Sequence, residues 1–328
     1  MCYALGDMSS VLEFEKPIAS LEEKLAEMRQ LTQEGPLDLS DEIRNLEKKI
    51  SSLQSEVFDG LDPWQRVQLS RHPQRPYTLD YIPLIFENFD ELKGDRRFGD
   101  DPALIAGFAE LNQQTVVILG HQKGRSTKEK MQRNFGMARP EGYRKAIRLM
   151  ELANRFGLPL ITFIDTPGAH PSIEAEERGQ SQAVAESILK LFELEVPILS
   201  VVIGEGGSGG ALAIGVANRV LMQEHSTYSV ISPEGCASIL WGDATQAAQA
   251  SAALKMNASE LLKLGIIDEI VPEPAGGAHR DTLQAAQLLK SALEKHLNSF
   301  SMSPEQDFRS ERLGRYRHVG ASAYRGEV

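Results

Sequence analysis

Cysteine is scarce in this sequence, which has only Cys2 and Cys236 among its 328 residues. Two thiols can form neither a disulfide framework nor a four-thiolate zinc site, so we expect a reducing compartment and no metal site on this chain. Long apolar runs are also missing, because the longest, near 196–203, is far too short to cross a bilayer. Residues 1–20 lack the basic-then-apolar pattern of a signal or transit peptide. The sequence therefore predicts a soluble, cytoplasmic protein with no membrane partner.

Basic residues are outnumbered by acidic ones: 35 Lys and Arg stand against 46 Asp and Glu, which gives a formal net charge of -11. Nonspecific binding of nucleic acid therefore has no global electrostatic support. With 41% hydrophobic residues, however, a chain of this length can bury a substantial core. The length is compatible with one large domain or two ordinary ones.

Glycine is concentrated in residues 196–220, the stretch around which the chain is organised. An apolar run of strand length ends at Gly204, and the segments EGGSGG and ALAIGVANRV follow. This order predicts a buried parallel strand, a tight glycine turn, and a helix whose first N–H groups lack partners within the helix. Glycine lets a ligand atom approach the main chain closely, and a helix N-terminus favours negative charge. We expect a main-chain cradle for an anion or an oxyanion.

The local sequence pattern does not determine which ligand this main-chain cradle binds, or whether it binds one. In a purely structural interpretation, the glycines only let the helix and the strand pack closely. Alternatively, GEGGSG at 204–209 matches the dinucleotide-binding fingerprint, and Glu224 stands about where the ribose-binding acid belongs.

Two further interpretations are catalytic. The segment GGSGG at 206–210 matches the nucleophile elbow of hydrolases, and His225 and His279 lie downstream as candidate bases. Alternatively, the N–H groups of Gly206 and Gly207 form an oxyanion hole.

The first hundred residues have a different texture. Residues 11–31 and 40–57 carry apolar residues at helical spacing on either side of a Gly-Pro break, which predicts a helical hairpin whose second helix is capped near Ser40. This hairpin covers either the core of its own chain or a partner subunit. Residues 60–100 are rich in proline, which excludes a long helix. We expect the arginines of this segment to be solvated or to face a partner: Arg71, Arg75, Arg96 and Arg97.

Beyond residue 100, strands alternate with helices. The predicted strands are 115–119, 160–164, 196–203, 219–222, 228–232 and 266–271, and the predicted helices are 143–156, 179–194, 244–264 and 281–298. The passages that lead to 165–169 and to 204–210 echo each other, since each runs from a helix through a Pro-preceded apolar strand to a glycine-containing loop. This repeat predicts parallel βα units whose loops gather at one sheet edge, where ligands bind in open α/β sheets.

Two segments are basic. Five Lys or Arg residues lie between 121 and 133, namely Lys123, Arg125, Lys128, Lys130 and Arg133. They form either a landing site for a phosphate-rich ligand or acidic partner, or simply a solvated loop. Near the end of the sequence stand four arginines that we expect to be solvated: Arg309, Arg312, Arg315 and Arg317. We divide the chain into an N-terminal hairpin and irregular linker (1–90), a main domain (91–300) and a basic tail (301–328).

Several long stretches together resemble one known family. They are HQKGRSTKEKMQRNFGMARPEGYRKAIRLM (121–150), ITFIDTPGAHP (161–171), AEERGQSQA (175–183), IGEGGSGGALAIG (203–215) and YSVISPEGCASILW (228–241), with LEFEKPI near the start and RHPQRPYTLDYI at 71–82. These motifs are similar to those of the carboxyltransferase alpha subunits of bacterial and plastid-type acetyl-CoA carboxylase. Motifs of this length are far more specific than any single glycine pattern, and they extend over nearly the whole chain.

The resemblance implies an α/β fold of crotonase-type repeated ββα units with an N-terminal helical hairpin. It also implies a transferase that is active only with a beta subunit, in an alpha2beta2 unit of a heterohexameric complex in the cytoplasm, or in the plastid stroma of a plant or alga. The carboxyl group would move from carboxybiotin, on the biotin carboxyl carrier protein, to acetyl-CoA, giving malonyl-CoA for fatty acid biosynthesis. ATP would be used by the separate biotin carboxylase, and zinc is expected on the beta subunit.

By this resemblance, the catalytic groups are the backbone N–H groups of Gly206 and Gly207, which would hold the biotin oxyanion. We expect larger side chains at position 207 to abolish transfer without unfolding the chain. The residues assigned to binding substrate or biotin are Thr166, Pro167, Gly168, Ala169, Ser208 and Gly209. The possible contacts with CoA or the carrier protein are Lys123, Arg125 and Lys128.

Two positions depart from the family pattern. His170 stands where the family more often carries Tyr, which changes an aromatic contact of the biotin or CoA pocket, and Asn218 stands where we expect an acid at the surface. The rival interpretations fit less well. A dinucleotide fold normally begins its sheet with the fingerprint, whereas about two hundred residues precede it here. Ser208 as a nucleophile needs an adjacent base, which the sequence does not assign.

Overall fold

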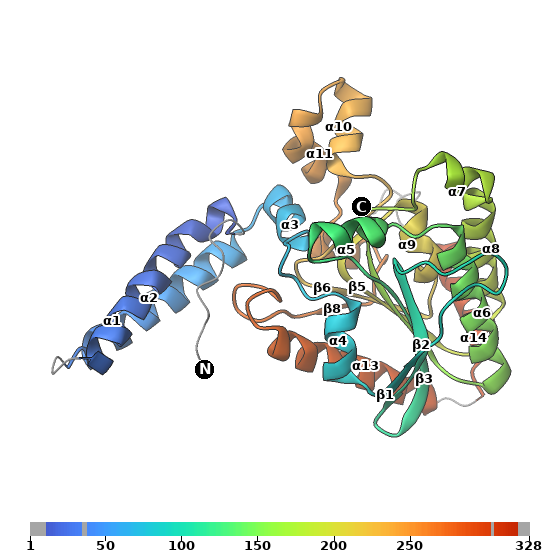
Figure 1. Cartoon of the computed structure of the whole chain (residues 1–328), viewed down its shortest axis with the longest axis horizontal. Coiled ribbons are helices and arrows are strands. Elements are labelled where there is room, and N and C mark those ends of the chain that lie inside the picture. The colour runs from blue at the N-terminus through green and yellow to red at the C-terminus, as the bar shows by residue number, and fades with distance from the viewer. Residues whose placement is uncertain (1–10, 35–37, 303–304, 321–328) are drawn as a thin grey trace.

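A single mixed sheet organises the molecule in a computed structural model that describes residues 11–34, 38–302 and 305–320. Within these residues the sheet has eight strands in the order β1-β2-β3-β4-β5-β6-β8, and β7 pairs with the end of β5 (Figure 1). The strands are β1 (Glu87–Glu91), β2 (Leu104–Leu111), β3 (Gln114–His121), β4 (Leu160–Thr166), β5 (Ile198–Gly207), β6 (Arg219–Gln223), β7 (Thr227–Ser229) and β8 (Glu269–Val271).

The sheet changes from antiparallel to parallel at β3. Strands β1, β2 and β3 pair antiparallel, whereas β3, β4, β5, β6 and β8 pair parallel in that order. A two-stranded hairpin followed by a helix and then by parallel strands is the arrangement of the predicted ββα units. The α/β class and the parallel βα units are therefore confirmed, and the carboxyl ends of β4 and β5 lie side by side.

Helices cover both faces of the sheet because the central strands are apolar on both faces. In β4, for example, Leu160 and Ile164 join one buried cluster, whereas Ile161 and Phe163 join the other. The first cluster lies under α6 (Pro140–Phe156), α8 (Gln180–Glu193) and α9 (Ser208–Gly215), and the second under α4 (Thr78–Ile85) and α13 (Thr282–Ser301). Besides two N-terminal helices, the other α-helices of the described residues are α3 (Pro63–Ser70), α5 (Thr127–Gln132), α7 (Ile173–Glu177), α10 (Pro233–Trp241), α11 (Ala247–Leu254), α12 (Ala258–Lys263) and α14 (Phe308–His318).

Most predicted elements occur where they were expected. The helix predicted at 143–156 begins earlier, at Pro140, and ends before Gly157, whose φ of 66° terminates it as predicted. The strand predicted at 228–232 is shorter, because Ser232 accepts a hydrogen bond from Gly235 N–H and starts α10 instead. Residues 60–100 contain two short helices, α3 and α4, besides β1. None of the helices in the described ranges is long and apolar enough to span a membrane.

The predicted N-terminal hairpin is present and extends away from the sheet (Figure 1). It consists of α1 (Lys16–Glu34) and α2 (Ser40–Asp59), which share a small apolar cluster with Leu61, just before α3, and with Leu69, near the end of α3. The N-cap of α2 is Leu39, so Ser40 is the first residue of the helix rather than its cap. Because most of the hairpin lies off the sheet, a role in binding a partner subunit stays a prediction.

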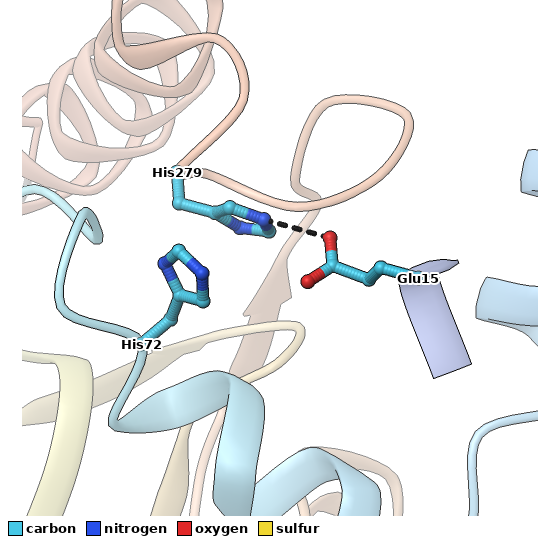
Figure 2. A group of neighbouring side chains, drawn as sticks. All are labelled: Glu15, His72 and His279. Carbon is cyan, nitrogen blue, oxygen red and sulfur yellow. Dashed lines mark hydrogen bonds and ion pairs between the residues drawn. The ribbon is translucent and has the colours of Figure 1, made fainter. Parts of the chain in front are cut away.

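The base of the hairpin contacts the main body through a buried polar cluster (Figure 2). His279 Nε2 lies 3.0 Å from Glu15 Oε1, and the rings of His72 and His279 are in contact, with centroids 4.0 Å apart and a tilt of 38° between their planes. Arg280 Nε donates to the same Glu15 oxygen at 3.3 Å. Burial alone would raise the pKa of Glu15, but the hydrogen bond and charge of His279 and the charge of Arg280 lower it. The hairpin is thus attached to the body by an ionised carboxylate.

Two imidazoles and a carboxylate are also a common set of zinc ligands, and their candidate ligand atoms lie within 4.8 Å of one another. Two contacts favour a hydrogen-bonded arrangement instead. The N–H of Gln74 donates to His72 Nδ1 at 3.2 Å, which leaves the proton of a neutral ring on Nε2. Arg280 also brings a positive charge to the carboxylate that a metal ion would need.

We expect Glu15→Gln to destabilise the protein by about 1.5–3 kcal/mol, because a charged hydrogen bond in a buried site is lost. The pKa of Glu15 is lowered in the folded chain, so its contribution is full above the ordinary value of 4.5 and disappears as the pH falls through the lowered value. Urea unfolding at pH 7 measures the loss. Glu13→Gln is the matched control, because Glu13 is exposed and forms an ion pair with Lys16, which is exposed as well. Equal losses in both variants would contradict this role of Glu15.

The C-terminal arginines are not all solvated, contrary to our expectation. Helix α14 packs against the main body, and the side chain of Arg312 is fully buried. It donates to the carbonyl oxygens of Leu191 and Leu194 at 3.0 and 2.6 Å, at the end of α8, and to Asn218 Oδ1 at 3.0 Å. Burial lowers the pKa of Arg312 to about 10. The buried guanidinium is tolerated because it donates hydrogen bonds to backbone carbonyls that have no partner within α8.

Asn218 is likewise not a surface position, so our expectation for it was wrong. Its side chain is 1% exposed, accepts hydrogen bonds from Arg312 and from the N–H of Ile198, and donates to the carbonyl of Phe308. The amide therefore joins the start of β5 to α14, and it needs both its acceptor and its donor to do so.

Candidate active site

The central glycine stretch forms a strand that passes directly into a helix. Strand β5 continues through Gly206 and Gly207, and α9 begins at Ser208. The prediction of a separate glycine turn between the strand and the helix was therefore wrong. The change of direction is concentrated at Ser208, whose φ is 53°. The side chain of Ser208 is exposed, whereas Gly207 and Gly209 are half-buried. Main-chain groups around the N-terminus of α9 can therefore meet a ligand.

The two loops predicted to meet at the sheet edge lie directly against each other. A Cβ atom added to Gly207 would lie 2.1 Å from the carbonyl oxygen of Pro167, and one added to Gly210 would lie 2.5 Å from the carbonyl carbon of Gly168. Real Cβ atoms do not come so close to backbone, so glycine is required at both positions. These glycines let the end of β5 and the start of α9 pack against residues 166–169.

Thr166 holds this second loop in shape. Its hydroxyl donates to the carbonyl oxygen of Gly168 at 2.7 Å and accepts from the N–H of Gly168 at 3.1 Å. Because the side chain of Thr166 is fully buried, it can shape the loop but not contact a ligand in this conformation. Pro167 is exposed and Ala169 half-buried, so these two residues form the part of the loop that faces solvent.

Gly206 lies between two neighbouring strands, opposite Thr166 of β4 and Tyr228 of β7, while Gly207 lies opposite Ser229 of β7. A Cβ atom on Gly206 would lie 2.7 Å from the ring of Tyr228. The backbone of Gly206 is thus held between two strands, and that of Gly207 between β7 and Pro167 of the 166–169 loop. A fixed N–H group is what an oxyanion hole requires, because it loses little energy to reorganisation when charge develops.

An ion-pair network that the sequence did not predict lies next to these glycines. Lys123 Nζ lies 2.7 Å from Asp165 Oδ1 and 2.8 Å from Glu205 Oε1, and Arg71 binds the other oxygen of Glu205 at 2.8 Å and Glu234 at 2.6 Å. Burial alone would lower the pKa of Lys123, but the two carboxylates raise it. Burial raises the pKa of Asp165, and Lys123 opposes that effect. The network places two cations among three carboxylates, and the pair of Lys123 and Asp165 is its part that is shielded from water.

Of the four arginines that we expected to face solvent or a partner, two pair with carboxylates of this chain and two are exposed. Arg71 belongs to this network, and Arg75 is 1% exposed and paired with Glu273 at 2.5 Å. Arg96 and Arg97 are exposed, as expected.

The candidate CoA or carrier contacts occupy different environments. The ammonium of Lys123 lies between two carboxylates and is unsuited to binding a phosphate. Arg125 is partly exposed, pairs with Asp80 and stacks on the ring of Tyr77 with 4.2 Å between its Cζ and the ring centroid. Lys128 is exposed on α5. A contact with CoA or the carrier stays a prediction, and Lys128 is the best placed of the three.

His170, at the end of the 165–169 loop, is half-buried. Its N–H donates to the carbonyl of Ala138 at 3.0 Å, and its carbonyl accepts from Gln180 Nε2 at 3.1 Å. Burial, with the positive charge of Arg139, lowers the pKa of the ring. The neutral ring is therefore the expected form at pH 7.

The structure bears on the two rival interpretations. Ser208 has the exposed, positive-φ geometry of a nucleophile elbow, but His225 Nδ1 contacts Arg66 at 3.1 Å and His279 contacts Glu15. Glu224 follows β6, where a ribose-binding acid would stand, but its carboxylate accepts the N–H of Glu273 at 3.2 Å. These candidate partners are engaged elsewhere.

The sheet is built from a β-hairpin and parallel strands, and its glycine-lined strand–helix junction faces a second loop. These features define a crotonase-type α/β protein. Among solved structures, transcarboxylase 12S with methylmalonyl-CoA and methylmalonic acid bound has this fold, with a TM-score of 0.51, 21% identity, and coverage of 64% of this chain and 40% of that chain. At this identity the likeness shows the fold alone.

Sequence comparison identifies the family within this class. Residues 11–320 match the family model described as acetyl co-enzyme A carboxylase carboxyltransferase-like. Acetyl-coenzyme A carboxylase carboxyl transferase subunit alpha of Azoarcus sp. is 53% identical over 95% of this chain and 99% of its own length, and that of Methylococcus capsulatus is 56% identical over 93% and 96%. The chain belongs to the family of acetyl-CoA carboxylase carboxyltransferase alpha subunits, which confirms the resemblance and the crotonase-type fold.

Proposed function

We propose that this chain is the alpha component of an enzyme that transfers the carboxyl group of carboxybiotin to acetyl-CoA, giving malonyl-CoA for fatty acid biosynthesis. The observation that carries the proposal is the family match over residues 11–320 together with the backbone junction at Gly206–Ser208. A beta subunit, a biotin carboxyl carrier protein and a biotin carboxylase are the proposed partners, with an alpha2beta2 core in the cytoplasm. ATP use belongs to the carboxylase, and any zinc to the beta subunit.

The proposed role of this chain is electrostatic. Carboxybiotin supplies the carboxyl group, and negative charge develops on an oxygen as that group leaves. The N–H groups of Gly206 and Gly207 lie next to the N-terminus of α9, and both favour negative charge at this place. No acid or base on a side chain of this chain is needed for that task. The negative oxygen of the acetyl group would be held by the beta subunit.

The residues around this junction fit a planar, uncharged ring better than a highly charged ligand. Pro167, Ala169 and Gly209 offer apolar or main-chain surface, and the exposed hydroxyl of Ser208 can donate or accept a hydrogen bond. We assign these four residues to binding the biotin ring or the acetyl group, and we assign Thr166 and Gly168 to shaping the loop that carries two of them. Lys128, with Arg125 beside it, is proposed to contact a phosphate of CoA or an acidic surface of the carrier protein.

Malonyl-CoA decarboxylation in the presence of free biotin tests the proposal. The chain is copurified with a beta subunit of the same family, and acetyl-CoA formation is followed with each subunit alone and with both together. We expect turnover only when both subunits and biotin are present. An assembled complex without turnover would contradict the proposal, and tight NAD binding by the isolated chain would revive the dinucleotide interpretation.

Ser208→Ala decides between carboxyl transfer and hydrolysis, because the motif at 206–210 and the exposed, positive-φ geometry of Ser208 favour a nucleophile elbow. We expect the variant to keep at least about a tenth of the wild-type rate, since the backbone N–H groups remain in place. Biotin-dependent decarboxylation by the complex measures this effect. A complete loss, with an acyl group trapped on the wild-type serine and detected by mass spectrometry, would favour a hydrolase.

A further inference from the structure

The end of β5 is irregular at the point where it approaches the candidate active site. Ile164 of β4 pairs with Val202 and Thr166 pairs with Gly206, so the single residue Asp165 faces three residues of β5. Such bulges bend a strand and redirect the residues that follow them. Here the residues that follow are Gly206 and Gly207, which form the proposed oxyanion hole.

Side chains hold the bulged residues where the pairing with β4 is interrupted, and Glu205 also pairs with Thr227 of β7. The carbonyl of Ile203 accepts a hydrogen bond from Arg75 Nε at 2.7 Å, and the N–H of Glu205 donates to Asp165 Oδ1 at 3.1 Å. Gly204 lies so close to the Asp165 carboxylate that an added Cβ atom would be 2.3 Å from Oδ1. Asp165 therefore both fills the bulge and satisfies its backbone.

Lys123 ties this carboxylate to the side chain of the bulged strand. Its ammonium bridges Asp165 Oδ1 and Glu205 Oε1 at 2.7 and 2.8 Å, and Arg71 occupies Glu205 Oε2. The side chain of Asp165 is 2% exposed, and those of Lys123 and Glu205 are each 13% exposed. Without Lys123, Asp165 would be a buried charge facing Glu205, and such a carboxyl group takes up a proton or moves. Either change would release the N–H of Glu205.

We propose that Lys123, Asp165 and Glu205 are positioning residues for carboxyl transfer, which hold the bulge of β5 so that the N–H groups of Gly206 and Gly207 point at the developing negative charge. This inference rests on the proposed function. None of the three side chains needs to touch the substrate, because they act through the backbone between residues 203 and 207. A displacement of a catalytic group by about 1 Å costs on the order of 100-fold in rate.

The test uses the complex with the beta subunit and biotin-dependent decarboxylation of malonyl-CoA. We expect Lys123→Met to lower kcat about 100-fold and to leave KM for malonyl-CoA within about twofold, because an interaction made only in the transition state is weakened. Glu205→Gln, which keeps its volume and one acceptor oxygen, should lower kcat about tenfold. Lys145→Met is the matched control, since Lys145 of α6 is another buried lysine that pairs with a carboxylate, that of Asp100, and this variant should keep kcat.

Wild-type kcat in both Lys123→Met and Glu205→Gln would overturn the inference and leave the proposed function intact, as would an equal loss in Lys145→Met. If Lys123→Met fails to assemble, Glu205→Gln decides. If the assembled wild type is itself inactive, the proposed function fails, and amide hydrogen exchange of residues 203–207 still decides the structural claim. That exchange should be faster in Lys123→Met than in Lys145→Met.

Discussion

Replacing Gly207 by alanine is expected to lower biotin-dependent decarboxylation by roughly 10²–10³-fold, the usual effect of losing an oxyanion-hole donor. The added methyl group would lie 2.1 Å from the carbonyl oxygen of Pro167, so the 166–169 loop must move away from β5. That movement changes the direction of the N–H group at 207 and the wall opposite it. The rate is measured with the purified complex at saturating malonyl-CoA and biotin.

The same clash changes our expectation for larger side chains at position 207. The sequence suggested that they would abolish transfer without affecting the fold, but crowding against backbone commonly costs about 1–3 kcal/mol. The stability of each variant must therefore be measured beside its rate. Gly314→Ala in α14 is the control, because a Cβ there meets nothing within 4 Å and should leave the rate unchanged. Full activity of Gly207→Ala in an intact complex would contradict the proposed oxyanion stabilisation by the backbone N–H groups of Gly206 and Gly207.

Replacing Arg75 by methionine is expected to destabilise the protein by about 3–5 kcal/mol, because it leaves a buried carboxylate without its partner. Arg75 Nη1 and Nη2 bind the two oxygens of Glu273 at 2.8 and 2.5 Å, and Nη2 also donates to Gln223 and Ser226. Burial alone would raise the pKa of Glu273, but Arg75 lowers it to about 2. Equilibrium unfolding in urea at pH 7 measures the loss.

The double variant Arg75→Met with Glu273→Gln should recover part of the lost stability, since no buried charge then remains. Arg44→Met is the control, because Arg44 and its partner Asp41 are both exposed, and its effect should be under about 0.5 kcal/mol. The wild-type pair should contribute fully above pH 4.5, the ordinary pKa of Glu273, and lose its contribution only as the pH falls toward 2. A loss below 1 kcal/mol in Arg75→Met would show that the pair is not important for stability.

The sequence predicted the central strand and the loop it faces because both depend on local pattern. Apolar runs of strand length, each preceded by Pro and followed by glycine, determined β4 and β5, and the parallel pairing of such units placed 165–169 beside 204–210. The strand β2 was missed because its hairpin turn, Asn112–Gln113, has φ values of 49° and 65° without the usual Asn-Gly signal. A run of LIAGFAEL before that turn was the available clue.

The ion pairs near the site could not be predicted, because their partners are far apart in the sequence. Lys123 and Glu205 are separated by 82 residues, and Arg75 and Glu273 by 198. The cations of residues 121–133 suggested either a landing site for a phosphate-rich ligand or acidic partner, or a solvated loop. Composition does not tell whether a lysine such as Lys123 faces solvent or a buried carboxylate. The prediction that Arg312 is solvated was wrong for the same reason, because its burial depends on the distant carbonyls at the end of α8.

The position of Arg312 has a consequence for synthesis on the ribosome. This side chain satisfies the carbonyls that end α8 and, through Asn218, is joined to the first N–H of β5. Translation must therefore reach residue 312 and release it from the exit tunnel before the carbonyls of Leu191 and Leu194 find this partner. The connection into the central strand is then among the last parts of the nascent chain to mature, and a ribosome that stalls earlier leaves it exposed to proteases and chaperones.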